Sequence, residues 1–250
     1  MFNTPPQRFG LASVAGLGLA LGLAPLTGCQ HAHKDDKKSY QAQAPISAEQ
    51  QAELTPDDVL ADLLAGNERY VKGKVSKPDI TERIAATATG QYPQAVILSC
   101  LDSRVPVELV FDQGIGDVFV GRVAGNVENE DQLGSMEFAT AAAGSKLVLV
   151  LGHSSCGAVK GACDDVQLGN LTALLSKIQP AVEAVPGHEG ARTSQNAAFV
   201  QEVVHKNVQL TVADIRERSE VLRGLEAEGK IKIVGAVYDL NTGKVTLLDA

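Results

Sequence analysis

The sequence predicts an α/β fold: a mostly parallel central β-sheet, flanked by helices, with one antiparallel edge strand. Short apolar runs have the length of strands that are buried on both faces. Helical patterns alternate with these runs, and such alternation is typical of parallel strands joined by helical crossovers. A turn sequence at Asn241 to Gly243 reverses the chain near its end, which predicts the antiparallel strand.

The expected elements follow one another along the chain from Thr55. Thr55 is suited to cap a helix, Pro56 to its first turn, and Asp57 and Asp58 to the positive end of its dipole. This helix is expected to end near Gly73. Further helical patterns cover residues 80–89, 132–143, 171–182 and 195–225. Strands are expected at 94–100, 117–121, 146–151 and 230–240, and the edge strand at 244–248.

The first 54 residues are predicted to lie outside this domain. An apolar run from Gly10 to Leu26 is short for a membrane span and is typical of an export signal. It ends in Leu-Thr-Gly-Cys29, which resembles the lipobox of bacterial lipoproteins, where the leader is removed and the cysteine is acylated. The alternative is an ordinary secretory signal with an incidental cysteine. We therefore expect a lipoprotein signal peptide at 1–28, a flexible tether at 29–54 and one domain at 55–250.

Charge and cysteine content exclude two further classes. The formal net charge is −8 and no stripe of Lys and Arg appears, so a nucleic-acid partner is not expected. Of the four cysteines, Cys29 is assigned to the lipobox and three remain. An odd number of thiols in an exported protein argues against a disulfide framework and favours a metal that holds thiolates.

Two clusters of chemically active residues follow the ends of predicted strands. Cys100 is followed at short spacing by Asp102 and Arg104, and His153 by Cys156. In an α/β sheet, ligands bind at the carboxyl ends of the strands, where both clusters fall. Two thiolates and one imidazole form the ligand set of a catalytic zinc site with one open position. Asp102 is either a fourth ligand or is held off the metal by Arg104. Singly, Cys100 would be a buried structural thiol and His153 a loop histidine.

At this point the sequence resembles the β-class carbonic anhydrases. The spacing C-x-D-x-R, then about fifty residues, then H-x-x-C followed by glycine, is typical of that family. Three further segments resemble it and extend the likeness over nearly the whole domain: 64–70 (LAGNERY), 119–126 (FVGRVAGN) and 235–243 (GAVYDLNTG). The second segment differs from the family pattern at Val123, where asparagine is usual.

The resemblance implies a zinc-dependent catalytic domain at 55–250 that interconverts carbon dioxide and bicarbonate. Cys100, His153 and Cys156 would be the zinc ligands, and hydroxide on zinc would attack carbon dioxide. Asp102 and Arg104 would form a dyad that gates and orients the fourth zinc position, with Asp102 as a ligand in a closed state.

The resemblance also suggests residues that contact the substrate. Phe119 falls where the family has an apolar wall, and the Gly157 N–H is placed to donate to a substrate oxygen. Gln91, nine residues before Cys100, matches the family's subtype with an open site, while Ile97 stands where the other subtype has tryptophan. Arg122 and Tyr238 nevertheless match the inhibitory bicarbonate pocket of that other subtype.

Assembly and location follow from the same resemblance and from the leader. The family forms homodimers and tetramers, so we expect one of these, on the periplasmic face of a bacterial membrane and lipid-anchored at Cys29. Three alternatives remain: a hydrolase of carbon disulfide or carbonyl sulfide on the same fold, a structural zinc site in a surface-anchored binding protein, and a hydrolase with Cys156 and His153 as nucleophile and base.

Overall fold

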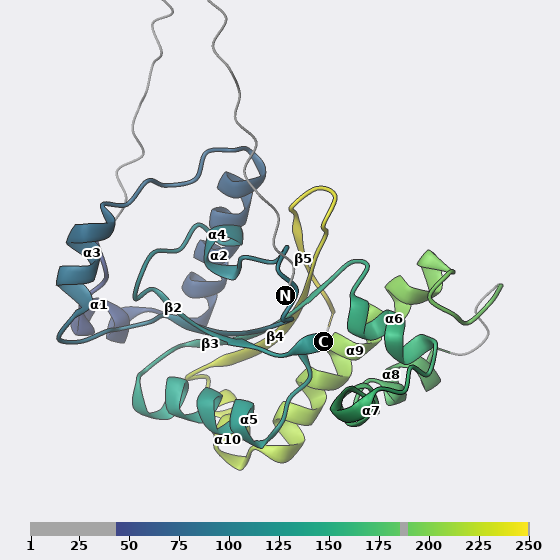
Figure 1. The fold of residues 1–250 in the computed structure, drawn as a ribbon. Helices are drawn as coiled ribbons and strands as arrows, with labels where there is room; N and C mark the ends of the chain where they lie inside the picture. The colour runs from purple at the N-terminus through teal and green to yellow at the C-terminus, as the bar shows by residue number, and fades with distance from the viewer. Residues whose placement is uncertain (1–43, 186–189, 250) are drawn as a thin grey trace, which may run out of the picture. The chain divides into compact units, whose positions relative to one another are not determined.

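The central sheet of the domain has five strands in the order β2-β1-β3-β4-β5 (Figure 1). The computed structural model describes residues 44–185 and 190–249. The strands are β1 (Ala95–Ser99), β2 (Val118–Arg122), β3 (Leu147–His153), β4 (Lys232–Tyr238) and β5 (Val245–Leu247). The first four run parallel, and β5 pairs antiparallel with β4. The predicted fold class is confirmed, including the antiparallel edge strand.

One face of the sheet is covered by α2 (Pro56–Val71) and α4 (Val107–Val110). Val59 and Leu63 of α2 are buried in one apolar cluster with alternate residues of the strands. Helix α2 begins as predicted: the Thr55 side chain accepts from Asp58 N–H and the Asp58 side chain from Thr55 N–H, a reciprocal capping box.

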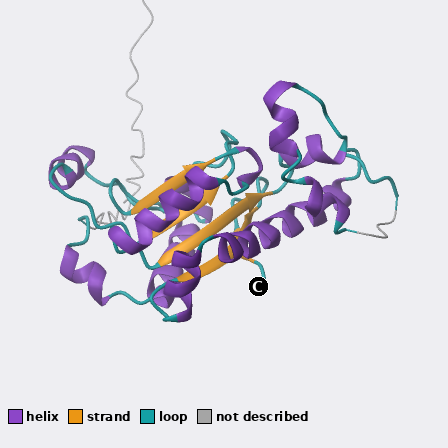
Figure 2. Ribbon diagram, turned by 90° about the horizontal axis from the view of Figure 1, so that it is seen from below, coloured by secondary structure: helices purple, strands orange, loops and turns teal. Residues whose placement is uncertain are grey.

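The other face is covered by helices of the second half of the chain (Figures 1 and 2). These helices and the strands form the larger apolar cluster. These helices are α5 (Glu130–Glu137), α6 (Gly157–Cys163), α7 (Gly169–Leu175), α8 (Gln179–Glu183), α9 (Ala197–Arg218) and α10 (Glu220–Ala227). Helix α5 continues into a π-helical turn at Phe138–Ala142. The strands alternate their side chains between the two clusters, so the sheet is buried on both faces.

Two of the predicted helices are each divided in two by a local signal. Pro180 lies in the first turn of α8, where its missing N–H costs nothing, so α7 and α8 are separate helices. Ser219 has extended backbone dihedrals and its hydroxyl accepts from Leu222 N–H, which ends α9 and caps α10.

Helix α1 (Ala48–Glu53) lies inside the segment that was expected to be tether. Its anchor is Gln51, which is buried and whose side-chain amide donates to Pro93 O at 2.8 Å and to Ala143 O at 2.9 Å. The regular structure of the domain therefore begins before Thr55. An amide anchor leaves no apolar periodicity, which is why the sequence pattern did not indicate this helix.

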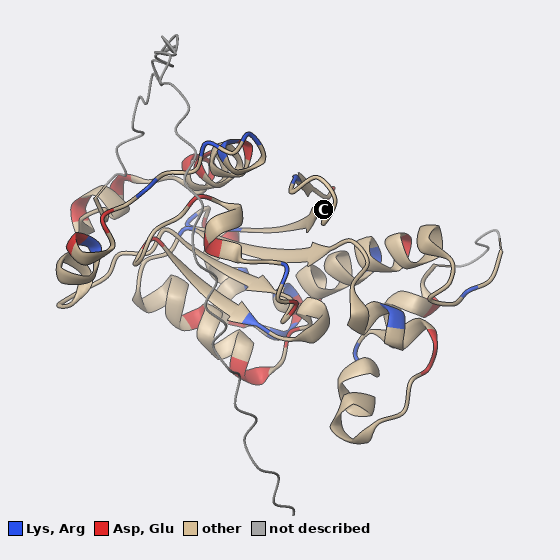
Figure 3. Cartoon of the chain, turned by 45° about the horizontal axis from the view of Figure 1, so that its top comes forward, with Lys and Arg blue, Asp and Glu red and all other residues tan. Residues whose placement is uncertain are grey.

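Helix α3 (Ile80–Thr87) lies at the periphery and begins at its cap, Asp79. Lys and Arg are interspersed with Asp and Glu along the described elements (Figure 3). Within the described residues, no helix combines the length and the apolar character needed to cross a bilayer. The predicted signal peptide and Cys29 lie outside these residues.

Candidate metal centre

Three potential metal ligands converge where β1 and β3 end. Cys100 directly follows β1, His153 is the last residue of β3, and Cys156 is the residue before α6. Because β1 and β3 are adjacent parallel strands, their carboxyl ends meet at one edge of the sheet. The two Sγ atoms are 3.9 Å apart, and one donor atom from each residue lies within 4.8 Å of the others. The structure thus brings together the three residues that the sequence predicted as ligands.

The imidazole of His153 is oriented as a metal ligand. Its Nδ1 lies 3.0 Å from Ser154 O, so Nδ1–H donates to this carbonyl and the lone pair is on Nε2. His153 is fully buried, and Nε2 has no hydrogen-bond partner among the described residues. A buried acceptor without a partner costs about 1–3 kcal/mol, which a bound cation would offset.

The spacing and charge of the thiols fit zinc. Two sulfur atoms bound to one tetrahedral zinc at about 2.3 Å lie roughly 3.8 Å apart. The Cys156 thiol is the largest cause that lowers the pKa of Cys100, to about 4, and the same pairing raises the pKa of Cys156. The pairing of the two thiols thus favours the thiolate form of Cys100, which is the form in which cysteine binds a metal. Three protein ligands leave the fourth position of a tetrahedral ion open, as in catalytic zinc sites.

Asp102 and Arg104 form a bidentate ion pair next to this cluster. Arg104 Nε lies 2.9 Å from Asp102 Oδ1, and Nη2 lies 2.7 Å from Oδ2. The hydrogen bonds from Arg104 are the largest cause that holds the pKa of Asp102 well below its usual range. Asp102 Oδ2 lies 3.8 Å from His153 Nε2, so a carboxylate lies beside the ring nitrogen that is free to bind a metal.

The loop that carries Cys100 and Asp102 is held by Arg122, at the end of β2. Arg122 Nε donates to Cys100 O at 3.0 Å, and Nη2 donates to Asp102 O. The sequence indicated Arg122 only through its match to a bicarbonate pocket and did not indicate this contact with the loop. Tyr238, the other residue of that match, places its hydroxyl 3.2 Å from that of Tyr70.

The loop from His153 to Cys156 makes a sharp turn that is fixed to β4. Ser155 has a φ of 54°, an uncommon conformation for a residue with a side chain. Ser154 N–H donates to Tyr238 O, and the Ser154 hydroxyl accepts from Leu240 N–H, both at 2.9 Å. These contacts support the strained residue and fix the two ligands relative to each other.

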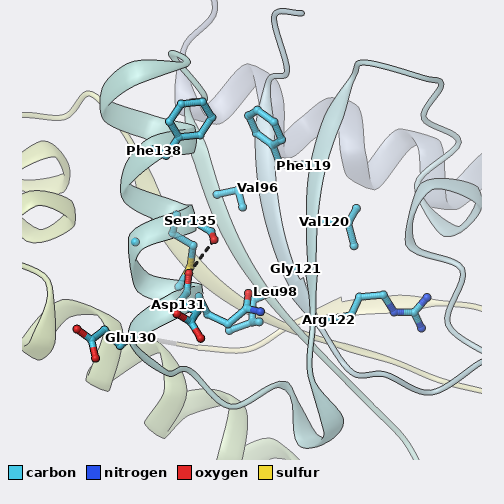
Figure 4. A pocket seen from close by; sticks show the side chains of 13 residues that line it. Val96, Leu98, Phe119, Val120, Gly121, Arg122, Glu130, Asp131, Ser135 and Phe138 are labelled. Carbon is cyan, nitrogen blue, oxygen red and sulfur yellow. Dashed lines mark hydrogen bonds between the residues drawn. The ribbon is translucent and has the colours of Figure 1, made fainter. Parts of the chain in front are cut away.

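Two of the predicted substrate-contacting residues, Phe119 and Gly157, lie close in space or in sequence to the potential metal ligands. Phe119 packs against the apolar cluster that contains Cys100 and Cys156, and it meets Phe138 edge to face at 6.1 Å. Both rings line an open hollow between β2 and α5 (Figure 4). Gly157 directly follows Cys156, and a Cβ there would meet no atom within 4 Å, so the space beside it is open.

Gln91 does not reach this site in its own chain. It precedes β1, whereas Cys100 follows β1, so the strand separates them by roughly 16 Å. Gln91 is exposed at the opposite end of the sheet. The spacing of nine residues that singled out Gln91 therefore does not correspond to proximity within one chain.

Comparison with known proteins supplies an independent observation. A family model described as "Carbonic anhydrase" matches residues 95–245. Carbonic anhydrase 2 of Mycobacterium tuberculosis H37Rv is 39% identical over 188 residues, which cover 75% of this chain and 90% of that protein. The carbonic anhydrase of Mycolicibacterium smegmatis is 38% identical over 183 residues, 73% of this chain and 88% of that protein.

Solved structures of similar fold agree with these sequence matches. The β-carbonic anhydrase CafA of Aspergillus fumigatus has a TM-score of 0.59 at 25% identity, covering 76% of this chain and 90% of that one. One of two tetrameric β-carbonic anhydrases from Sordaria macrospora has a TM-score of 0.57 at 24% identity, covering 65% and 84%. The second likeness concerns the fold alone.

Proposed function

The chain belongs to the β-class carbonic anhydrase family, and we propose that it hydrates carbon dioxide reversibly with a zinc ion held by Cys100, His153 and Cys156. The observation that carries the proposal is the buried Nε2 of His153, which has no partner among the described residues and belongs to a ring with a nitrogen within 4.8 Å of both thiol sulfurs. When bound, zinc would lower the pKa of water to about 7 and so provide a nucleophile at neutral pH.

Asp102 would orient the attacking water and would not remove its proton. Arg104 keeps the Asp102 pKa far below neutrality, so this carboxylate is a weak base but a permanent hydrogen-bond acceptor. By accepting from the attacking oxygen, it would turn a lone pair toward the carbon of the substrate. Arg104 would hold the carboxylate in that orientation by its two hydrogen bonds.

The substrate side of the site would be formed by Phe119 and Gly157. Carbon dioxide is small and apolar, so an aromatic wall suits it, and the Gly157 N–H begins α6 where no side chain blocks approach. Gln91 could contribute only to the metal centre of another copy of the chain, because the metal centre of its own chain lies at the other end of β1.

We propose a homodimer or tetramer on the basis of the β2 edge. In the described residues β2 pairs only with β1, so its outer edge presents unpaired backbone groups. The hollow beside it is lined by apolar side chains such as Phe138, which is 59% exposed, and by Arg122, Glu130 and Asp131 (Figure 4). Apolar surface with charges of both signs suits a second copy of the same face. Sedimentation of the purified protein tests this, and a monomer at micromolar concentration would contradict it.

We propose, from the leader alone, that the protein is exported and lipid-anchored at Cys29 on the periplasmic face of a bacterial membrane. Cys29→Ser should then prevent acylation and release the domain from the membrane fraction. Mass spectrometry of the mature N-terminus tests this directly, because an unacylated terminus in the wild type would contradict the anchor.

The activity is tested by stopped-flow hydration of carbon dioxide with zinc counted on the same sample. We expect fast hydration with about one zinc per chain, loss on chelation and recovery on adding zinc back. A zinc-loaded, folded but inactive protein at every pH would overturn the proposal, and carbon disulfide would be the next substrate to try.

A further inference from the structure

The long helix α9 buries two polar side chains, Asn207 and Thr211, and of these the Asn207 amide has the larger need for hydrogen-bond partners. Its inward face consists largely of valines, including Val203, Val204 and Val208, which pack under β3 and β4. Asn207 lies among them and is only 3% exposed. An amide buried in apolar surroundings costs free energy unless a specific hydrogen bond compensates for it.

Asn207 makes that hydrogen bond to the segment beside the metal centre. Its Nδ2 donates to Gly125 O at 2.8 Å, a contact between residues 82 positions apart. Gly125 in turn points its N–H at Cys100 Sγ, with N and S 3.3 Å apart. The carbonyl and the amide of one glycine thus connect the helix to a predicted zinc ligand.

The segment that contains Gly125 is strained and needs such an anchor. Gly125 has a φ of 75° and Asn126 a φ of 45°, two successive residues in the left-handed region. A Cβ at Gly125 would come within 2.5 Å of Ile178 Cδ1, so the backbone also packs too closely for a side chain. Such conformations persist only where surrounding contacts determine them.

We propose that Asn207 is a positioning residue of the zinc site: by holding Gly125 O, it keeps the Gly125 N–H aimed at the Cys100 thiolate. The inference rests on the zinc site proposed above. A hydrogen bond to a metal thiolate draws electron density from sulfur, which tunes the bond to the metal and fixes the ligand's direction. Asn207 touches neither metal nor substrate and acts through Gly125.

The test compares Asn207 with a matched asparagine on α2, which covers the opposite face of the sheet. Asn67 of α2 is also buried, and its Nδ2 donates to Val110 O at 3.1 Å and to Gly243 O at 2.9 Å. Asn207→Leu, Asn207→Asp and Asn67→Leu are prepared in the full-length protein. Asn207→Asp keeps the size of the side chain but replaces the amide donor with a carboxylate, which repels Gly125 O, whereas Asn207→Leu removes the donor without adding a charge.

Zinc affinity and the spectrum of the cobalt(II)-substituted protein are the two measurements. We expect both Asn207 variants to bind zinc about tenfold or more weakly than wild type. Their thiolate-to-cobalt charge-transfer band should move to longer wavelength, because a thiolate without its hydrogen bond gives up electron density more easily. Asn67→Leu should lose stability but keep the wild-type band and zinc affinity.

The outcomes separate this inference from the function proposed above. If both Asn207 variants keep the wild-type band and affinity, Asn207 is structural and the inference is overturned, whatever stability is lost. A second measurement needs no variant: cadmium-113 in the wild-type protein should show scalar coupling to the Gly125 amide proton, and its absence would also overturn the inference. A wild-type protein without any thiolate-to-cobalt band would instead contradict the zinc site itself.

Discussion

Two Asp–Arg pairs of the domain show how location determines what one kind of contact does. Asp102 and Arg104 lie two residues apart in one loop beside the metal centre, and the Arg104 side chain is 56% exposed. Asp117 and Arg83 lie 34 residues apart, and the Arg83 side chain is only 6% exposed. The first pair lies beside the imidazole of His153, whereas the second joins helix α3 to the turn before β2.

The two aspartates respond oppositely to their surroundings. Hydrogen bonds from Arg104 are the largest influence on Asp102 and hold its pKa well below the usual range. For Asp117 burial is the largest influence, and it raises the pKa although Arg83 and Gly114 N–H act against it. The pair with the exposed arginine keeps a charged carboxylate beside the metal ligands, while the pair with the buried arginine connects two parts of the fold. An ion pair therefore indicates function only together with its neighbours.

The largest expected effect on the rate of carbon dioxide hydration comes from removing one of the proposed metal ligands, because the proposed role of Asp102 depends on the metal. Cys156→Ser should lose zinc and lower the rate of carbon dioxide hydration by at least about 1,000-fold, because most of the rate enhancement depends on the metal. Cys163→Ser is the control, because this half-buried thiol is not one of the three potential metal ligands. Burial raises the pKa of Cys163 to about 11. Stopped-flow rates and zinc content check both variants. A zinc-loaded Cys156→Ser protein would contradict the ligand assignment.

The next effect separates the two aspartates by function. Asp102→Asn should lower kcat/KM about 100-fold while zinc stays bound. The variant would lose the charged hydrogen-bond acceptor beside the proposed open position of the metal. Asp117→Asn should leave the rate nearly unchanged. Zinc content and steady-state kinetics on both variants are the measurements. If Asp102→Asn loses its zinc instead, Asp102 acts mainly as a ligand.

The free energy of unfolding should also distinguish the two pairs, but here the larger effect is expected for Arg83 and the smaller for Arg104. Arg83→Ala should lower the free energy of unfolding by about 3–5 kcal/mol, because the Arg83 side chain is itself buried and its removal leaves Asp117 and Ile115 O without this donor. Arg104→Ala should change it little, because the Arg104 side chain is mostly in water. Urea denaturation of the two variants measures both values. Equal losses would show that burial does not distinguish the pairs.

The smallest expected effect is on stability in acid. Asp102 has a folded-state pKa below its unfolded value of about 3.9, so its contribution is present above that value and is lost as pH falls. Asp117 has a raised pKa, so its contribution grows as pH falls and is lost as pH rises through its folded-state pKa.

In the Asp102→Asn variant the free energy of unfolding should therefore fall less steeply as pH decreases than in the wild type. In the Asp117→Asn variant it should fall more steeply. Urea denaturation of the zinc-free proteins between about pH 6 and pH 3 measures the two slopes. The same slope in both variants would contradict the opposite shifts.

Local signals made much of this protein predictable from its sequence. The strands were placed within about two residues at every end, because apolar runs on both faces of a parallel sheet are short and continuous. Thr55 and Asp58 were recognisable as a helix start because capping acts between residues three apart. The ligand types and their place at strand ends indicated the metal centre, since strand order brings such ends together.

The sequence by itself determined the fold class, the family and the donor set at Cys100, His153 and Cys156. Only the tertiary structure showed the buried pair of Arg83 with Asp117 and the contact of Asn207 with Gly125. The physical reason is range. Periodicity, capping and strand ends act between neighbours in the chain, whereas a hydrogen bond across 82 residues depends on how helices pack on the sheet and leaves no local pattern.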